Sequence, residues 1–382
     1  MQMKIISVNP MTSCYKILAH FILFAVAAAF LIFHIRSAVN PERYPTQIHS
    51  NHDAEETCSK IVKLRDFESY DSSEHQAFFL ETSGKPFLAG RQACSVESAA
   101  LKSNLTLHVI FKSETLDLSK SKSFCDIYFK YKNVNYYSAD FEKVFSGTPV
   151  EGIKKRIDNV VAHGVCHYSD IARLALLYKY GGFYLDMDII ILKSLREVKN
   201  AYSIEHAKPR VRRWAEVGLC LKDDSSTQRS HQIFNGNLHL SAGHELPWRI
   251  LEHVNKTYNS SRSDRHMIGP EVSSGVIKAM FHIKTFYNEF MPSPTKNSKS
   301  SLSILPGHAF LPADYEDVGP LLWPSEPKTP QQWDTLFNCS YMVHYYSNKW
   351  GKLKASGNPK RDSYSYLGPN FCPKAFQHLD EF

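Results

Sequence analysis

The sequence lacks several patterns that would place it in a common functional class. It has no dense run of lysine and arginine, and its net charge is only +7, so nucleic-acid binding is not expected. It has no Cys-x-x-Cys or cysteine–histidine finger spacing among its eight cysteines, which argues against structural zinc. It also has no internal repeat. The hydrophobic content of 43% is enough for a sizeable folded core.

One long stretch near the N-terminus contains no charged residue. Residues 17–35 (ILAHFILFAVAAAFLIFHI) hold no Asp, Glu, Lys or Arg, and a helix of this length rises about 30 Å, the thickness of a bilayer core. The apolar part of a cleaved signal peptide is shorter, roughly 7–15 residues. We therefore expect an uncleaved signal-anchor over residues 17–36 after a cytoplasmic tail of residues 1–16. Basic residues flank both ends of the run, and Lys4 and Lys16 favour a cytoplasmic N-terminus.

The chain beyond this run has features of the secretory pathway. Residues 37–75 are polar and include Pro41 and Pro45, as expected of a stem. Seven of the eight cysteines follow the apolar run, and disulfides are expected in an oxidising lumen. Because seven is odd, at least one of these cysteines lies outside an intramolecular pair. Four Asn-x-Ser/Thr sites support the same compartment, at Asn104, Asn255, Asn259 and Asn338.

Strand-like apolar runs alternate with helical patterns between residues 76 and 195. This alternation predicts an α/β fold with a mainly parallel sheet and right-handed crossovers. The chain becomes less regular after Arg196. The predicted elements are strands at 77–80, 105–111, within 126–137 and at 341–346, helices at 91–102, 142–159 and 265–281, and a tight turn at 234–237.

Two carboxylates interrupt one of the most apolar parts of the chain. In residues 169–195 (SDIARLALLYKYGGFYLDMDIIILKSL) the pattern predicts a helix N-capped by Ser169, a Gly-Gly turn and a buried strand over 183–192. Side chains at i and i+2 of a strand point to one face, so Asp186 and Asp188 should converge on one cation. Such a pair is typical of a hard divalent metal shared with phosphates. The alternative is a surface strand end with two solvated aspartates.

Two further charged residues lie on the helix before this strand. Asp170 and Arg173 are three residues apart and therefore share one helix face. They are either a capping residue with its salt bridge or part of the same site as the aspartates. His344 lies on the predicted strand over 341–346, where a lone histidine is usually structural or exposed.

Several blocks of the sequence resemble a known family. Besides the Asp-x-Asp block, FFLETS at 78–83, CSVESAA at 94–100 and YMVHYYSNKWGK at 341–352 resemble the α1,4-glycosyltransferases. That group includes lactosylceramide α1,4-galactosyltransferase and α1,4-N-acetylglucosaminyltransferase. The resemblance runs from about residue 78 to about residue 373. It implies a GT-A fold, with a Rossmann-like, mainly parallel sheet flanked by helices, and a UDP-sugar donor.

The resemblance also implies a metal shell. Mn²⁺ or Mg²⁺ would bridge the aspartates and the diphosphate and offset its charge. Asp188 would be the direct ligand, while Asp186 would ligate through water or contact the ribose and sugar. His344 would complete the shell, because VHYYSNKW is similar to the family's Val-His-x-x-x-x-Lys pattern.

The family pattern implies roles for the neighbouring residues. Asp170 would bind sugar hydroxyls, Arg173 the sugar or phosphate, and Lys349 or the nearby Ser347 the diphosphate. The family retains the anomeric configuration, but no residue's spacing identifies a nucleophile here, and Glu271 and Asp314 are only arguable candidates.

We therefore expect a single-pass type II Golgi membrane enzyme with a luminal catalytic domain. It would move a hexose or N-acetylhexosamine in α1,4 linkage to a terminal sugar on a glycosphingolipid. The alternatives are a transferase of the same fold that acts on glycoprotein glycans, a non-catalytic membrane lectin and a metal-dependent hydrolase. Donor sugar, disulfide pairing and oligomeric state are not predicted. The expected divisions are tail 1–16, signal-anchor 17–36, stem 37–75, nucleotide-sugar-binding part 76–195 and acceptor-side part 196–382.

Overall fold

A computed structural model describes most of the chain after Cys58. The described residues are 58–67, 75–159, 164–205, 230, 232–259, 268–287, 289–293, 300–313 and 315–382. The expected tail and signal-anchor lie outside them, and no helix among the described residues is long and apolar enough to cross a membrane. Part of the expected stem is described, and its residues 58–67 include strands β1 and β2.

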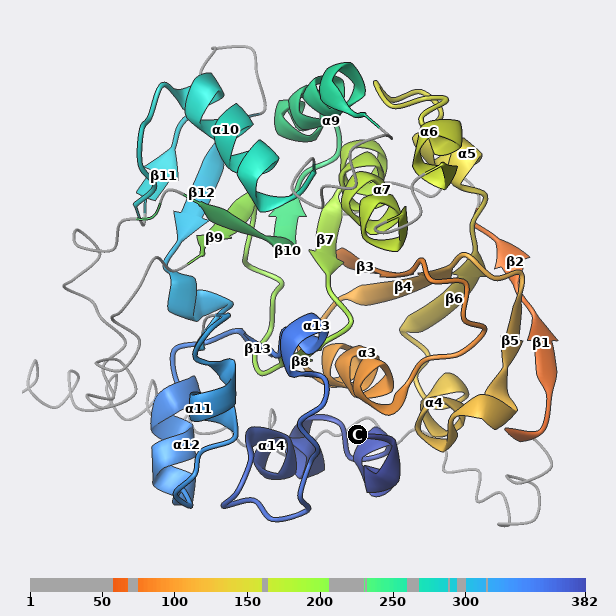
Figure 1. Ribbon diagram of the computed structural model, residues 1–382, viewed down its shortest axis with the longest axis vertical. Coiled ribbons are helices and arrows are strands. Elements are labelled where there is room, and N and C mark those ends of the chain that lie inside the picture. Colours follow the sequence, from red (N-terminus) through yellow and green to blue (C-terminus); the bar gives the residue numbers. More distant parts are fainter. Residues whose placement is uncertain are drawn as a thin grey trace, which may run out of the picture. The chain divides into compact units, whose positions relative to one another are not determined.

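A nine-stranded mixed sheet runs through the described part of the chain (Figure 1). Its order is β11-β12-β9-β10-β7-β3-β4-β6-β2, and the strands from β7 to β2 are parallel. Two small antiparallel pairs, β1–β5 and β8–β13, stand apart from it. The strands are β1 (Ile61–Lys63), β2 (Arg65–Asp66), β3 (Gln76–Glu81), β4 (Thr106–Phe111), β5 (Thr115–Asp117), β6 (Val134–Ser138), β7 (Gly182–Leu185), β8 (Ile189–Ile191), β9 (Ala201–Ile204), β10 (Ile233–Leu240), β11 (Glu289–Met291), β12 (Leu302–Leu305) and β13 (Met342–His344).

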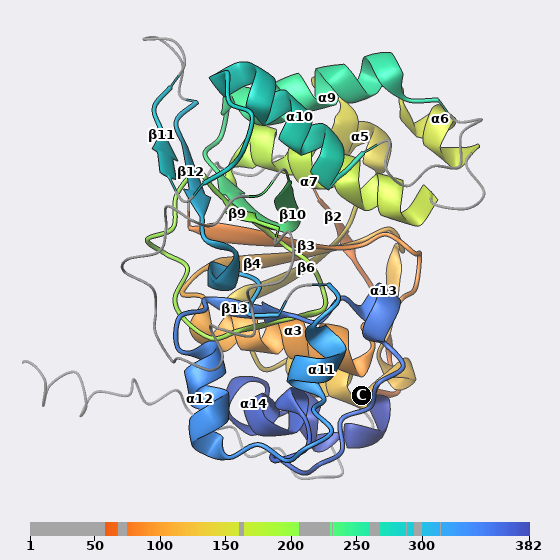
Figure 2. The same cartoon turned by 60° about the vertical axis from the view of Figure 1, so that its left-hand side comes forward.

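Helices cover both faces of the sheet, which explains why the residues of its central strands are buried on both faces. All six residues of β3 are buried, as expected for a parallel strand with helices on both sides. In Figure 2, α7, α9 and α10 lie on one face and α3, α12 and α14 on the other. The helices are α3 (Gly90–Lys102), α4 (Lys122–Tyr128), α5 (Phe141–Phe145), α6 (Lys154–Asp158), α7 (Gly164–Tyr180), α9 (Glu245–Thr257), α10 (Pro270–Phe281), α11 (Val318–Leu322), α12 (Pro330–Phe337), α13 (Ser347–Trp350) and α14 (Ser363–Phe371).

Two helix predictions need correction. The predicted helix over 142–159 is two short helices, α5 and α6. Gly147 and Gly152 between them have φ of 71° and 77°, a region that glycine adopts without strain. The helix expected to start at Ser169 is α7, which begins at Gly164, so Ser169 is inside the helix and is not its N-cap.

One strand prediction and one turn prediction near the aspartates were also wrong. The predicted strand over 183–192 is divided into β7 and β8, which belong to different sheets, and Asp186 and Asp188 lie in the connection. The backbone N–H of Asp186 bonds to Gly236 O at 2.9 Å, after which the chain leaves the large sheet. The predicted turn at 234–237 is instead part of β10, which has a register irregularity between Phe234 and His239.

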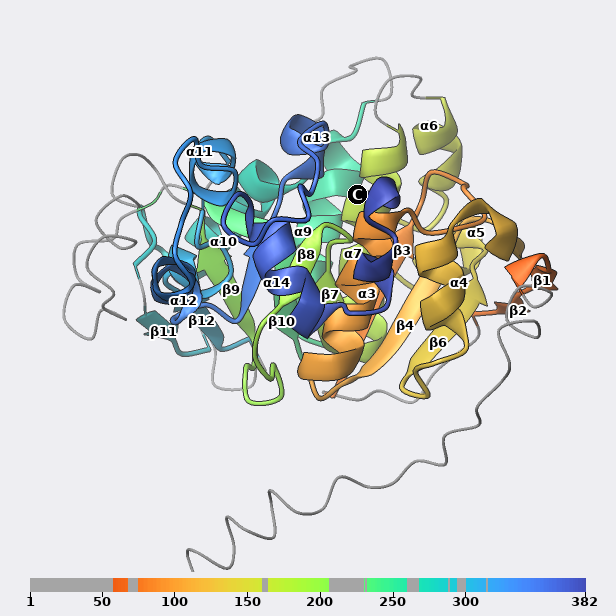
Figure 3. The same ribbon diagram turned by 90° about the horizontal axis from the view of Figure 1, so that it is seen from below.

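Disulfides join segments that are far apart in sequence. Cys58 is bonded to Cys125 and Cys94 to Cys372, and Cys339 is also disulfide-bonded. The Cys166 side chain is exposed. The Cys94–Cys372 bond ties α3 to the C-terminal segment, which lies beside α3 in the view from below (Figure 3).

A buried histidine makes the fold sensitive to acid. His108 on β4 is fully buried between the rings of Phe78 and Tyr137, at centroid distances of 5.4 and 5.8 Å. Burial and then the nearby charge of Arg65 lower the pKa of His108 from 6.5 to about 4. Between these pH values the unfolded chain takes up a proton at His108 and the folded chain does not, so stability falls as the pH drops.

We predict that His108→Phe removes the part of the stability loss at low pH that is due to His108. The wild type should lose up to about 3 kcal/mol more unfolding free energy than the variant between pH 6.5 and pH 4. Urea unfolding at a series of pH values measures the difference, and parallel curves for the two proteins would contradict it.

Candidate active site

The site lies at the point where the strand order of the parallel sheet reverses. The chain moves outward from β3 through β4 to β6, then returns to β7 on the other side of β3. Open α/β sheets bind ligands beyond the carboxyl ends of the strands at such a point. Asp186 follows the end of β7 directly.

Three predicted side chains meet there. Nε2 of His344 lies 3.0 Å from Asp188 Oδ1 and 3.4 Å from Asp186 Oδ2, and the ligand atoms of all three lie within 4.8 Å of one another. They converge because β13 pairs with β8 so that His344 is opposite Ile189. We call this group the carboxylate–imidazole cluster. The predicted convergence of the aspartates therefore holds, although a turn and not a strand produces it.

Asp186 is fixed from its own chain and from β10. The Tyr184 hydroxyl donates to Asp186 Oδ1 at 2.7 Å, and Asn237 Oδ1 accepts the Asp186 N–H at 3.1 Å. A Cβ on Gly236 would lie 2.4 Å from Asp186 Oδ2, closer than atoms can approach, so any other residue there would displace the Asp186 carboxylate. The sequence could have pointed to Tyr184, which precedes Asp186 by two residues, but not to Asn237.

Asp188 and His344 are held by the segment that follows β13. The Ser347 N–H donates to Asp188 Oδ2 at 2.6 Å, and the Tyr345 N–H donates to the Asp188 carbonyl at 2.9 Å. The Tyr346 N–H donates to Nδ1 of His344 at 3.2 Å, which leaves Nε2 to face the carboxylates. The backbone thus orients both groups without using another charged side chain.

The cluster is electrostatically coupled. Burial alone would lower the pKa of His344, but the carboxylates of Asp188 and Asp186 outweigh it and raise that pKa to about 9. Burial would raise the pKa of Asp188, but His344 and the Ser347 N–H hold it below its usual value. Without a metal, an imidazolium therefore occupies the position between the carboxylates.

The predicted Asp170 and Arg173 lie beside the cluster. Arg173 Nη2 is 3.0 Å from Asp170 Oδ1 and 3.6 Å from Asp186 Oδ1, and Nη1 donates to the Asn235 carbonyl at 2.7 Å. The guanidinium also lies 4.2 Å over the Tyr184 ring, and its side chain is only 7% exposed. Arg173 is therefore an internal tie between α7, β7 and β10, and it borders the same open space as Asp170.

Two cavities meet at the cluster and share Asp186 and Asp188. The first, which we call the α3 cavity, has a volume of about 460 Å³, and its lining includes Lys85, Arg91 and Lys354. The second, the α10 cavity, has a volume of about 590 Å³. Its lining includes Asp170, Glu205, Asn235, Glu271, Tyr315 and Tyr346. The first cavity thus brings three cationic side chains close to the two aspartates and Glu381. The second carries carboxylates, amides and aromatic rings, with Arg173 also in its lining.

The structure does not bring Lys349 to the cluster. Its amine contacts Glu316 and lies 4.4 Å over the Tyr315 ring, and Lys349 lines neither cavity. The α3 cavity is lined by Arg91 and Lys354, two cationic residues that the sequence alone did not single out. No local pattern marks them, because they come from α3 and from the chain after α13.

The donor set of the cluster fits a divalent metal. Carboxylate oxygens suit Mg²⁺ and Mn²⁺, and a mixed set with one imidazole is compatible with Mn²⁺. Asp186, Asp188 and His344 are the residues that would hold it, and each offers a ligand atom to the same small space.

Comparison with known proteins agrees with this geometry. A family model described as "Glycosyltransferase sugar-binding region containing DXD motif" matches residues 90–205, which include the cluster's two aspartates. A second, described as "Alpha 1,4-glycosyltransferase conserved region", matches residues 239–379, which include His344. Together they match more than half of the chain.

Curated relatives and solved structures were also found. A lactosylceramide 4-alpha-galactosyltransferase of Gorilla gorilla gorilla is 25% identical over 81% of this chain and 85% of its own. A human alpha-1,4-N-acetylglucosaminyltransferase is 24% identical over 79% of each chain. The solved PaToxG glycosyltransferase shares 14% identity over 60% of this chain and 75% of its own, at a TM-score of 0.39, which is too low to define a shared fold. The family models and the relatives agree: the chain belongs to the glycosyltransferases that combine a DXD-containing sugar-binding region with an α1,4-glycosyltransferase conserved region.

Proposed function

We propose that this protein is a metal-dependent, retaining glycosyltransferase of GT-A type. It moves a hexose or N-acetylhexosamine from a UDP-sugar in α1,4 linkage to a terminal sugar. The observation that carries the proposal is the carboxylate–imidazole cluster in a chain of this family, because the cluster lies between a cavity with three cationic side chains and a cavity rich in carboxylates.

The charges of the two cavities support a division of the substrates. The α3 cavity, with Lys85, Arg91 and Lys354, suits the uridine diphosphate. Arg91 is 8% exposed, and its two terminal nitrogens are buried without a hydrogen-bond partner, so a bound anion would compensate its charge. The α10 cavity, with Asp170 and other carboxylates and amides, suits sugar hydroxyls, since these groups accept and donate hydrogen bonds.

In this mechanism the chain mainly positions charged groups. A divalent metal on Asp186, Asp188 and His344 would offset the diphosphate charge as UDP leaves. Arg173 keeps Asp170 and Asp186 at fixed positions on one side of the cluster. Asp170 would then accept hydrogen bonds from the transferred sugar.

We place the enzyme in the Golgi membrane as a single-pass type II protein acting on a glycosphingolipid. The uncharged run at residues 17–35 supports a membrane anchor. The Cys58–Cys125 and Cys94–Cys372 disulfides support an oxidising compartment. The relatives named for lactosylceramide support a lipid-linked acceptor.

A panel of donors and acceptors tests this proposal. The full-length protein in detergent should hydrolyse one UDP-sugar slowly in Mn²⁺, and should transfer it faster to lactosylceramide than to glycoprotein glycans. EDTA should abolish both reactions. Transfer to glycoprotein glycans alone would indicate the alternative acceptor, and sugar binding with no Mn²⁺-dependent turnover of any UDP-sugar would indicate a lectin.

A comparison of two lysines, one inside the α3 cavity and one outside it, provides a sharper test of the donor cavity. We predict that Lys354→Met raises the dissociation constant of UDP about fivefold, the size expected for one exposed ion pair, because Lys354 lines the α3 cavity. Lys349→Met is the matched control, since its amine is held by Glu316. Calorimetric titration with UDP and Mn²⁺ measures both, and a loss confined to Lys349→Met would restore Lys349 as the diphosphate contact.

A further inference from the structure

Two serines of α3 bind β8, the strand that directly follows the second aspartate. Ser95 Oγ accepts the Ile189 N–H at 3.0 Å and donates to the Ile189 carbonyl at 2.7 Å. Ser98 Oγ accepts the Ile191 N–H at 3.0 Å. Both serines are fully buried, and one helical turn separates them, so they lie on one face of α3.

The Ser95 and Ser98 hydroxyls bond the backbone edge of β8 that a neighbouring strand would otherwise pair with. The other edge of β8 pairs with β13, where the Tyr345 N–H bonds to the Asp188 carbonyl at 2.9 Å. In an antiparallel pair alternate residues point their backbone groups to opposite edges. Ile189 and Ile191 therefore face away from β13, toward α3. Ser95 binds both polar groups of Ile189, as the facing residue of another strand would.

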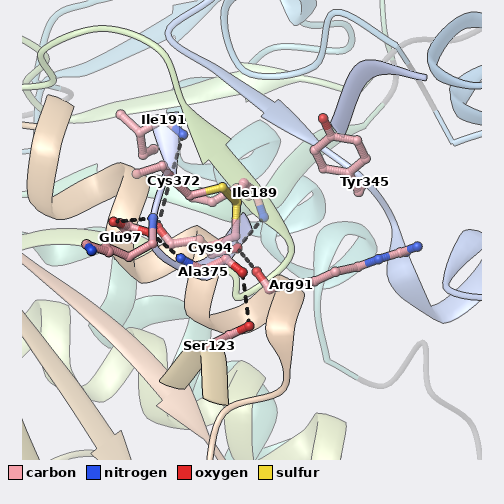
Figure 4. The surroundings of a disulfide bond; sticks show 12 residues. Arg91, Cys94, Glu97, Ser123, Ile189, Ile191, Tyr345, Cys372 and Ala375 are labelled. Atoms are coloured by element: carbon pink, nitrogen blue, oxygen red, sulfur yellow. Dashed lines mark hydrogen bonds between the residues drawn. A yellow bond between two sulfur atoms is a disulfide. The ribbon is translucent and has the colours of Figure 1, made fainter. Parts of the chain in front are cut away.

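The same turn of α3 is itself anchored. Cys94 is disulfide-bonded to Cys372, and the buried Glu97 accepts the backbone N–H groups of Lys374 and Ala375 at 3.0 and 2.8 Å. Figure 4 shows this arrangement, with Ile189 and Ile191 on one side of the disulfide and Ala375 on the other. The block CSVESAA at 94–100 thus joins α3 to β8 through its serines, and to the C-terminal segment through its cysteine and glutamate.

We infer that Ser95 is a positioning residue for the metal site. Ser98 adds to this role by holding β8 at Ile191, two residues beyond the contact of Ser95. Ser95 fixes the residue directly after Asp188 by both its N–H and its carbonyl, and β13 fixes the opposite edge. The position of the Asp188 carboxylate relative to His344 then depends on α3. This inference rests on the proposed metal binding, and it assigns a role to the CSVESAA block, which lies outside the cluster.

Removing the Ser95 hydroxyl should weaken metal binding at the carboxylate–imidazole cluster. Ser95→Ala leaves two backbone groups of Ile189 without a partner in a buried place, so β8 must shift or open. We expect the Mn²⁺ dissociation constant to rise about tenfold, the lower end of the effect for residues that orient metal ligands. Ser98→Ala should have a smaller effect, because Ile191 is three residues from Asp188.

Ser123→Ala is the matched control. Ser123 is equally buried and donates to the Ala375 carbonyl at 3.0 Å, so its loss tests the same packing region without touching β8. The experiment measures Mn²⁺ binding to each full-length variant, its stability in urea, and hydrogen exchange of the metal-free peptide over residues 188–191. Exchange there should speed up about tenfold in Ser95→Ala and stay unchanged in Ser123→Ala.

The outcomes separate this inference from the proposed function. A wild type that binds no Mn²⁺ contradicts the proposed function, while the exchange data still decide whether Ser95 holds β8. Wild-type Mn²⁺ affinity or unchanged exchange at 188–191 in Ser95→Ala overturns the positioning role, as does an equal loss of affinity in Ser123→Ala. If Ser95→Ala does not fold, Ser98→Ala is compared with the control in the same way.

Discussion

Replacing Asp188 by asparagine should abolish sugar transfer, with a fall in kcat/KM of about 10³-fold or more. Asparagine keeps the shape of the side chain and one oxygen. That oxygen can accept the Ser347 N–H, which lies 2.6 Å from Asp188 Oδ2 in the wild type. It removes the negative charge that faces His344 at 3.0 Å and would face the metal. Metal stabilisation of a leaving diphosphate contributes several kcal/mol, and each 1.36 kcal/mol is a factor of ten in rate.

The matched control is Asp126→Asn. Asp126 Oδ2 lies 2.8 Å from Nε2 of His378, so it is also a carboxylate paired with an imidazole, but it lines neither cavity. This variant should keep wild-type transfer rates in a Mn²⁺ titration. Urea unfolding of both variants checks that the loss in Asp188→Asn is not a loss of fold. Turnover of Asp188→Asn within tenfold of the wild type would contradict the metal site.

The parallel half of the fold was predictable, because its strands are short apolar runs between clear helices. Strands β3 and β4 and helix α3 lie within one residue of their predicted ranges at 77–80, 105–111 and 91–102. The break between β7 and β8 was not predictable, since FYL and III are equally apolar on both sides of Asp186. Strand β7 ends at Leu185, where its pairing with β10 ends. Because β10 lies more than 45 residues later in the chain, the local sequence carries no signal of that contact.

The site, like the fold, has a part that could be predicted from the sequence and a part that could not. Asp186 and Asp188 stand out as charges in an apolar run, and the structure brings them to His344. They are held mostly by backbone groups, such as the N–H of Ser347 and of Tyr345, and every residue type except proline has a backbone N–H. The sequence therefore indicates which side chains form the proposed metal site, while the parts that orient them depend on tertiary contacts.

Replacing His344 by alanine should weaken metal binding more than it weakens acceptor binding. The ring is 5% exposed and faces both carboxylates through Nε2, so its loss removes one of three ligands. Loss of a residue that only orients a ligand costs roughly 10–100-fold in metal affinity, and a ligand should cost at least that much. We expect the Mn²⁺ dissociation constant to rise on the order of 100-fold, while the KM for the acceptor at saturating Mn²⁺ changes less than threefold.

His378→Ala is the control for this prediction, because His378 is paired with Asp126 outside both cavities. It should leave the Mn²⁺ titration unchanged. The alanine variant at 344 also leaves Asp186 and Asp188 as neighbouring carboxylates without the cation between them, and like charges at this distance oppose ionisation. Added Mn²⁺ should therefore still raise its melting temperature, but only at concentrations about 100-fold above those needed by the wild type. An unchanged Mn²⁺ titration in His344→Ala would remove His344 from the shell and leave the two aspartates as the protein's ligands.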